Sequence, residues 1–63
     1  MNISENIKSR RKAMSMSQSE LAAAIGVSTS MVCQIERGTK AVSLQLGAEI
    51  AEVLECDIAD LIV

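Results

Sequence analysis

The feature that most restricts the fold of this chain is a pair of short helical patterns in residues 18–37, separated by three residues. The separating segment begins with Gly26, and glycine adopts without steric penalty the left-handed backbone that a tight turn between crossed helices needs. Ala22 lies where the two helices would approach most closely, so a larger side chain there would push them apart. The residues expected to hold this packing are Leu21, Ala22, Ile25, Gly26, Val32 and Ile35.

Residues that suit helix ends border both patterns. Ser17 and Glu20 have the spacing of a capping box, in which the serine accepts from a backbone amide and the glutamate reaches back to the cap. Ser28 is the N-cap candidate of the second helix, which ends by Gly38. Local signals thus predict two short helices with defined ends.

Apolar residues at helical spacing predict three further helices. The first covers residues 3–14, and its inner face consists of Ile3, Ile7 and Met14. Ser43 caps a later helix, whose inner residues are Leu46, Ile50, Val53 and Leu54. A short last helix opens at residues 57–60, with Leu61 and Ile62 as its apolar contacts. We therefore predict an all-α fold, a compact five-helix domain that spans residues 1–63.

The composition argues against an enzyme and against a metal or cofactor site. The chain has no Phe, Trp or Tyr, so its core must be aliphatic, and it has no His, the commonest general base and metal ligand. Cys33 and Cys56 lie 23 positions apart without a C-x-x-C pair, which fits neither a zinc site nor a redox motif. A single disulfide is the alternative, but small secreted domains usually have several disulfides. A reduced intracellular chain is therefore favoured.

Neither a membrane span nor a signal peptide is indicated. The longest apolar stretch, residues 21–25, is far shorter than the roughly 18 residues of a transmembrane helix. The first five residues lack the basic-then-apolar order of a signal peptide. Membrane binding through the basic first helix is weakly supported, because its apolar stripe is narrow. We expect a cytoplasmic protein without a membrane partner.

The net charge of −2 conceals an uneven distribution along the chain. Residues 1–40 carry all six Lys and Arg against three Glu, whereas residues 41–63 carry five acidic residues and no basic one. This asymmetry suggests a basic face for an acidic partner and an acidic back. The alternative is a solvated surface with unevenly charged helices.

Helical periodicity also assigns an outer face to the second helix of the pair. If Val32 and Ile35 point inward, the outward residues are Thr29, Ser30, Cys33, Gln34 and Arg37. This face is polar but carries one charge, and a glutamine suits bidentate contact with adenine in the major groove. The alternative is an ordinary exposed helix face. Because the face would stand on a well-defined turn, nucleic-acid recognition is the favoured interpretation.

Three segments carry a resemblance to a known family: Gln18-Ser19-Glu20-Leu21-Ala22, Ile25-Gly26-Val27-Ser28 and Val32-Cys33-Gln34-Ile35-Glu36-Arg37-Gly38. They resemble the helix-turn-helix of phage Cro and repressor proteins and of bacterial regulators of the xenobiotic-response-element type. The resemblance implies a lambda-repressor-like fold with the helix-turn-helix at residues 18–37. It also implies a transcriptional regulator, usually a repressor, whose recognition helix at residues 29–36 enters the major groove of double-stranded DNA.

The resemblance also implies roles for single residues. Thr29, Ser30 and Gln34 match base-reading positions, and Cys33, atypical at its place, is a further candidate that alternatively fills space. The candidate phosphate contacts are Gln18, Arg10, Arg37, Thr39 and Lys40. Arg11 and Glu36 match a partly buried ion pair between the first helix and the recognition helix, with a phosphate contact as the alternative for Arg11.

The chain departs from the family pattern at Gly47 and Ala48, where relatives usually carry larger aliphatic residues, and we expect loose packing there. A homodimer on a palindromic operator is expected, since one recognition helix reads only a few base pairs. The chain ends Asp60-Leu61-Ile62-Val63, and this aliphatic end suits an isologous contact. Alternatively, the chain is a fragment of a longer regulator that dimerises elsewhere.

Two further expectations concern the setting of the chain. The family implies a bacterial or phage-encoded protein that acts in the cytoplasm, at the nucleoid. The rival function is a helical protein-interaction module, adaptor or antitoxin-like, that would use the acidic residues after position 40 and have no direct DNA role.

Overall fold

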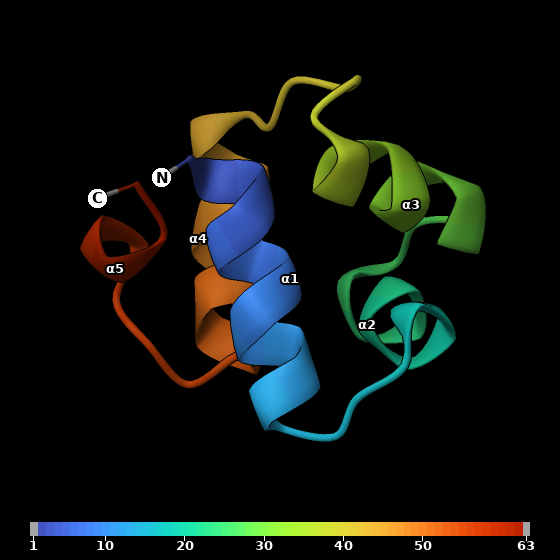
Figure 1. Cartoon of the computed structure of the whole chain (residues 1–63), viewed down its shortest axis with the longest axis horizontal. Helices are drawn as coiled ribbons and strands as arrows, with labels where there is room; N and C mark the ends of the chain where they lie inside the picture. The colour runs from blue at the N-terminus through green and yellow to red at the C-terminus, as the bar shows by residue number, and fades with distance from the viewer. Residues whose placement is uncertain (1, 63) are drawn as a thin grey trace.

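The computed structural model describes residues 2–62, which form five α-helices and no β-strand (Figure 1). The helices are α1 (Ile3–Ala13), α2 (Gln18–Ile25), α3 (Thr29–Arg37), α4 (Leu44–Val53) and α5 (Ile58–Ile62). The all-α prediction is therefore confirmed. In Figure 1, α2 and α3 lie at one end of the molecule and α5 at the other, with α1 and α4 between them.

The helix ends follow the local signals of the sequence. Four helices begin after a side-chain cap, which accepts a hydrogen bond from the backbone three residues later; these caps are Asn2, Ser17, Ser28 and Ser43. At Ser17 the predicted capping box is complete, because Glu20 N donates to the serine hydroxyl at 3.0 Å and Ser17 N donates to the Glu20 carboxylate at 2.8 Å. Gly26 and Gly38 end α2 and α3 with φ of 72° and 80°, a conformation that glycine adopts without strain.

The core between the helices is aliphatic. Its buried residues are Ile7, Leu21, Ala22, Val32, Ile35, Ile50, Ala51, Leu54 and Leu61. They come from every helix and from the C-cap of α4, so each helix contributes at least one side chain to the same cluster. Within this arrangement α3 packs against α1 and α2, and α5 packs against α1 and α4.

Two residues expected to point inward are exposed. Met14 follows the end of α1 and is 38% exposed, whereas Met16, in the connection to α2, packs against the core. Ile62 is 63% exposed, because successive residues of a helix point about 100° apart and its neighbour Leu61 takes the buried position. Val63 lies outside the described residues.

The expected looseness of α4 is also wrong at Gly47. This residue is buried, and Ile58 of α5 occupies the space that a side chain would need. The neighbouring Ala48 is exposed and leaves no gap in the core. Glycine therefore allows close approach of α5 to the first half of α4.

A buried amide ties the first helix to the last. Asn6 Nδ2 donates to the backbone carbonyl oxygen of Leu61 at 2.7 Å, and Asn6 is 7% exposed. The end of a helix has carbonyl groups without intrahelical partners, so this bond satisfies one of them inside the protein. No sequence pattern predicts this contact, because Asn6 and Leu61 are 55 positions apart.

Cys33 and Cys56 are both free and half-buried. No helix within residues 2–62 is both long and apolar enough to cross a membrane. Over the same residues, no cluster of His, Cys, Asp and Glu could hold a metal ion.

Candidate nucleic-acid interface

The outer face of α3 is built by the burial of its opposite face. Val32 and Ile35 are each 1% exposed, and they anchor α3 against α1 and α2. Periodicity then turns five other residues outward. Thr29, Ser30 and Arg37 are exposed, and Cys33 and Gln34 are half-buried on this face. The structure thus brings the four candidate base-reading residues onto one side of α3.

The turn before α3 holds that face in a defined position. The backbone N–H of Val27 donates to the carbonyl of Ala22 at 3.0 Å, and Ala22 is only 2% exposed beneath α3. Gly26 contributes through its backbone conformation and not through packing, because nothing lies within 4 Å of the Cβ position at this residue. The hydroxyl of Thr29 donates to the Ser19 hydroxyl at 3.2 Å, which links the first residue of α3 to α2.

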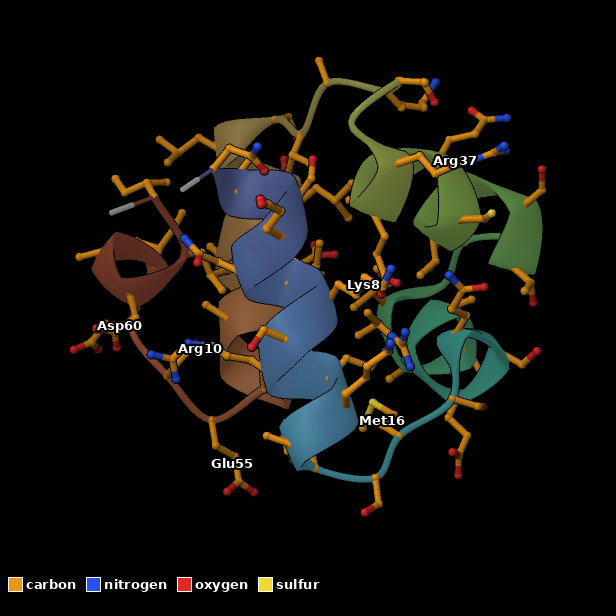
Figure 2. The ribbon with its side chains drawn as sticks, in the orientation of Figure 1. Lys8, Arg10, Met16, Arg37, Glu55 and Asp60 are labelled. Atoms are coloured by element: carbon orange, nitrogen blue, oxygen red, sulfur yellow. The ribbon has the colours of Figure 1, made fainter. Side chains whose placement is uncertain are left out.

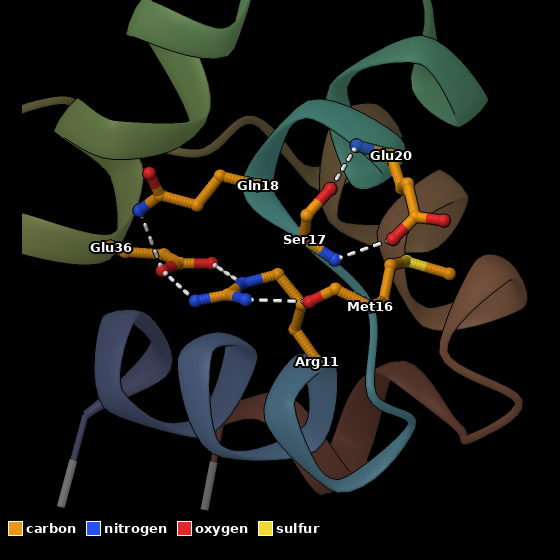
Figure 3. Close-up of polar contacts among 6 residues, drawn as sticks. All are labelled: Arg11, Met16, Ser17, Gln18, Glu20 and Glu36. Carbon is orange, nitrogen blue, oxygen red and sulfur yellow. Dashed lines mark hydrogen bonds and ion pairs between the residues drawn. The ribbon is translucent and has the colours of Figure 1, made fainter.

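A buried ion pair joins α1 to α3 (Figure 3). Arg11 Nε donates to Glu36 Oε2 at 2.6 Å, and Arg11 Nη2 donates to Glu36 Oε1 at 3.0 Å. The remaining terminal nitrogen, Nη1, donates to the carbonyl of Met16 at 2.6 Å. The side chains of Arg11 and Glu36 are 9% and 2% exposed, respectively. All three guanidinium nitrogens are therefore engaged within the protein, which favours the ion pair over a phosphate contact for Arg11.

A third helix joins this pair through Gln18, the first residue of α2. Gln18 Nε2 donates to Glu36 Oε1 at 3.1 Å, so the same carboxylate oxygen accepts from Arg11 and from Gln18 (Figure 3). The acidic residue of α3 is thus neutralised by Arg11 and held in place by its neighbours. The side chain of Gln18 is fixed at the junction of the three helices.

The pKa values of the pair both move in the direction that keeps it ionised. Burial pushes the pKa of Glu36 upward, but hydrogen bonds from Arg11 and Gln18, together with the positive charges of Arg11 and Lys8, outweigh it and hold the pKa below its usual value. The hydrogen bond to Glu36 raises the pKa of Arg11 despite its burial. The pair is therefore charged at neutral pH.

The predicted phosphate contacts do not all lie together. Arg37, Thr39 and Lys40 are exposed at the C-terminal end of α3, and Figure 2 shows Arg37 reaching outward from that helix. The hydroxyl of Thr39 donates to the carbonyl of Gln34 at 3.3 Å. Arg10, by contrast, lies on the side of α1 toward Asp60 and away from α3 (Figure 2). The structure does not bring Arg10 to the α2–α3 face.

Lys8, which was not predicted as a site residue, lies on the side of α1 that faces α3 (Figure 2). Its charge acts on Glu36, so its ammonium belongs to the surroundings of the Arg11–Glu36 pair. The signal that could have found it is spacing, because residues three apart share one face of a helix, and Lys8 precedes Arg11 by three.

The comparison with known protein families agrees with this geometry. A family model described as helix-turn-helix matches residues 7–61. The chain belongs to the Cro/C1-type helix-turn-helix family. Members of this family are DNA-binding transcriptional regulators and not enzymes. A search of curated protein sequences gave no match.

Solved structures of regulators are similar to the chain over nearly its whole length. The phage P22 c2 repressor in complex with a synthetic operator is 26% identical, with a TM-score of 0.91 over 98% of this chain and 94% of the repressor chain. SinR, a master regulator for biofilm formation solved in complex with DNA, is 35% identical, with a TM-score of 0.87 over 94% and 95%.

A third similar structure comes from a longer protein. The clp gene regulator ClgR from Corynebacterium glutamicum is 32% identical, with a TM-score of 0.90 over 94% of this chain. The chain spans 63% of the ClgR chain, so ClgR contains a further part that has no counterpart in residues 1–63.

Proposed function

We propose that residues 1–63 act as one sequence-specific DNA-binding domain of a transcriptional regulator, in which α3 lies in the major groove of double-stranded DNA. The observation that carries this proposal is the exposed polar face of α3, which stands on a buried helix-turn-helix and beside a neutralised ion pair. Two of the structurally similar regulators were solved in complex with DNA, which supports the same kind of partner here. Repression by occupation of an operator is the proposed mode of action.

Base reading is assigned to one face and phosphate contact to its borders. The proposed base-reading residues are Thr29, Ser30, Cys33 and Gln34, and the proposed phosphate contacts are Gln18, Arg37, Thr39 and Lys40. Base contacts specify sequence, whereas phosphate contacts position the protein on the duplex. Because the basic residues are few, we expect modest nonspecific affinity, and this affinity falls as the salt concentration rises. Arg10 is left out of the proposed interface because of its position on α1.

A homodimer on a palindromic operator extends the proposal. One recognition helix covers few base pairs, and two copies related by a two-fold axis would read half-sites about 34 Å apart. The exposure of two large apolar side chains, Leu44 at 78% and Ile62 at 63%, supports a contact between copies. We propose that the DNA-binding protein acts at the nucleoid, in the cytoplasm of a bacterium.

Selection of bound duplexes from a random DNA pool, at near-physiological salt, tests this function. A palindrome with half-sites about ten base pairs apart would support sequence-specific dimeric recognition. A single short half-site would support recognition by a monomer and contradict the dimer. No enrichment with a folded protein would contradict DNA binding and favour an interaction module that uses the acidic residues after position 40.

A further inference from the structure

Lys8 and Arg10 have the same charge and lie two residues apart on α1, yet they serve different faces of the molecule. Two residues correspond to about 200° of rotation around a helix, so the two side chains point in nearly opposite directions. Figure 2 shows Lys8 toward α3 and Arg10 toward Asp60 of α5. Lys8 is exposed. The basic charge that α1 presents beside the recognition helix is therefore that of Lys8.

The positive charge of Lys8 is not neutralised by the Arg11–Glu36 ion pair beside it. Glu36 accepts both of its short charged contacts from Arg11, at 2.6 and 3.0 Å, and a third hydrogen bond from Gln18. Among residues 2–62, the Arg11–Glu36 pair is the one salt bridge, and the side chain of Lys8 makes no direct ion pair or hydrogen bond within that part of the chain. With Arg11 and Glu36 neutralising each other, the junction carries one excess positive charge, that of Lys8.

The same junction holds Gln18, whose amide is fixed by Glu36 at 3.1 Å. Gln18 begins α2, where the capping box uses the N–H groups of Ser17 and Glu20, and the N–H groups of residues 18 and 19, which have no intrahelical partner, favour an anion. A phosphate beside Gln18 would otherwise lie near the Glu36 carboxylate. The ion pair with Arg11 neutralises the Glu36 carboxylate and removes that repulsion. The ammonium of Lys8 then makes the local charge positive, which attracts a phosphate.

We propose that Lys8 contacts a backbone phosphate of bound double-stranded DNA on the Gln18 side of the interface, as a positioning residue that carries no sequence information. The proposal rests on the proposed DNA-binding function and adds a residue to it. It also assigns Arg10 a place outside the interface, although both residues contribute equally to the net charge.

The test is the salt dependence of DNA binding by two charge-matched variants, Lys8→Gln and Arg10→Gln. The probe is a duplex of the sequence enriched by selection, and the equilibrium constant is measured from about 50 mM to about 200 mM salt. Each phosphate contact contributes about 0.9 to the slope of log affinity against log salt, so wild type should lose about 3.5-fold more affinity over this range than Lys8→Gln. Arg10→Gln should keep the slope of wild type, and Lys8→Arg should restore it.

Three outcomes would contradict the proposal in different ways. A wild-type slope in Lys8→Gln would overturn the contact while leaving the proposed function intact. Equal loss of slope in both variants would also overturn it, because only net charge would then matter. Absence of binding by the wild-type chain would overturn the proposed function and this inference together. Thermal unfolding of both variants checks that they are folded, as the exposure of Lys8 leads us to expect.

Discussion

A Cβ atom at Gly47 would lie 3.3 Å from Cδ1 of Ile58, so α5 occupies the space that a side chain on this turn of α4 would need. That distance is shorter than ordinary van der Waals contact. A methyl group of Val42 lies 3.7 Å from the same point and closes the space further. The departure from the family pattern at Gly47 is thus matched by the position of the last helix.

The first prediction is that Gly47→Leu destabilises the protein by about 1–3 kcal/mol, because the larger side chain must displace Ile58. The matched control is Ala48→Leu at the exposed neighbouring position, where we expect a change within about 0.5 kcal/mol. Urea unfolding of the two variants measures both values. Equal stability of the two variants would show that α5 can move without cost and that the close contact with Ile58 does not affect stability.

The second prediction concerns the crossing of α2 and α3 at Ala22, which is 2% exposed. Ala22→Leu should destabilise the fold by about 1–3 kcal/mol through overpacking between the two helices. Ala24→Leu adds the same side chain to the same helix at an exposed position and should have little effect. An unchanged melting temperature in Ala22→Leu would disprove the close packing inferred for this crossing.

The third prediction concerns the buried ion pair. Arg11→Ala should destabilise the protein by about 3–5 kcal/mol, since it leaves the buried carboxylate of Glu36 without its charged partner. Lys12→Ala removes the same charge from the next, exposed position and should cost much less. Chemical unfolding at neutral pH compares them. Similar losses in the two variants would mean that the pair contributes little beyond net charge.

The fourth prediction is the pH dependence of that pair. The pKa of Glu36 is below its unfolded value of about 4.3, so the stabilisation is present above that pH and is lost as the pH falls through the folded pKa. Wild type should therefore lose its advantage over Glu36→Gln as the pH falls below about 4.3 and through the lowered pKa of Glu36. Unfolding free energies across this range measure the difference.

A second carboxylate must be removed from that experiment. Hydrogen bonds from the backbone and hydroxyl of Ser17 also lower the pKa of Glu20. Both proteins are therefore compared in a Glu20→Gln background, which keeps the capping-box geometry because glutamine also serves at this position. A constant difference between the two proteins from neutral to acidic pH would contradict the role assigned to Glu36.

The fifth prediction concerns base reading by Gln34, which lies half-buried on the outer face of α3. Gln34→Ala should lose about 1–3 kcal/mol of discrimination at one base pair of the selected sequence. Binding profiles of the variant and of wild type, measured over all single-base changes, give this value. If the two profiles agree at every position, Gln34 is not a reader.

The local elements of this protein could be predicted from its sequence. Ser17, Ser28 and Gly26 mark helix ends by chemistry that acts within a few residues, and the periodicity of Val32 and Ile35 assigns the faces of α3. The candidate base-reading face follows from that periodicity alone. The placement of Arg11 against Glu36 needed the family resemblance, because nothing in the spacing of two residues 25 positions apart indicates a contact.

The tertiary structure decided how each face is used. Periodicity shows that Lys8 and Arg10 point apart, but only the packing of α3 and α5 on opposite sides of α1 decides which one borders the candidate interface. In the same way, the sequence predicts loose packing at Gly47, whereas in the tertiary structure Ile58 occupies the space beside this glycine. Helix signals act over a few residues, whereas the partner of a helix face comes from a distant segment, as in the bond between Asn6 and Leu61.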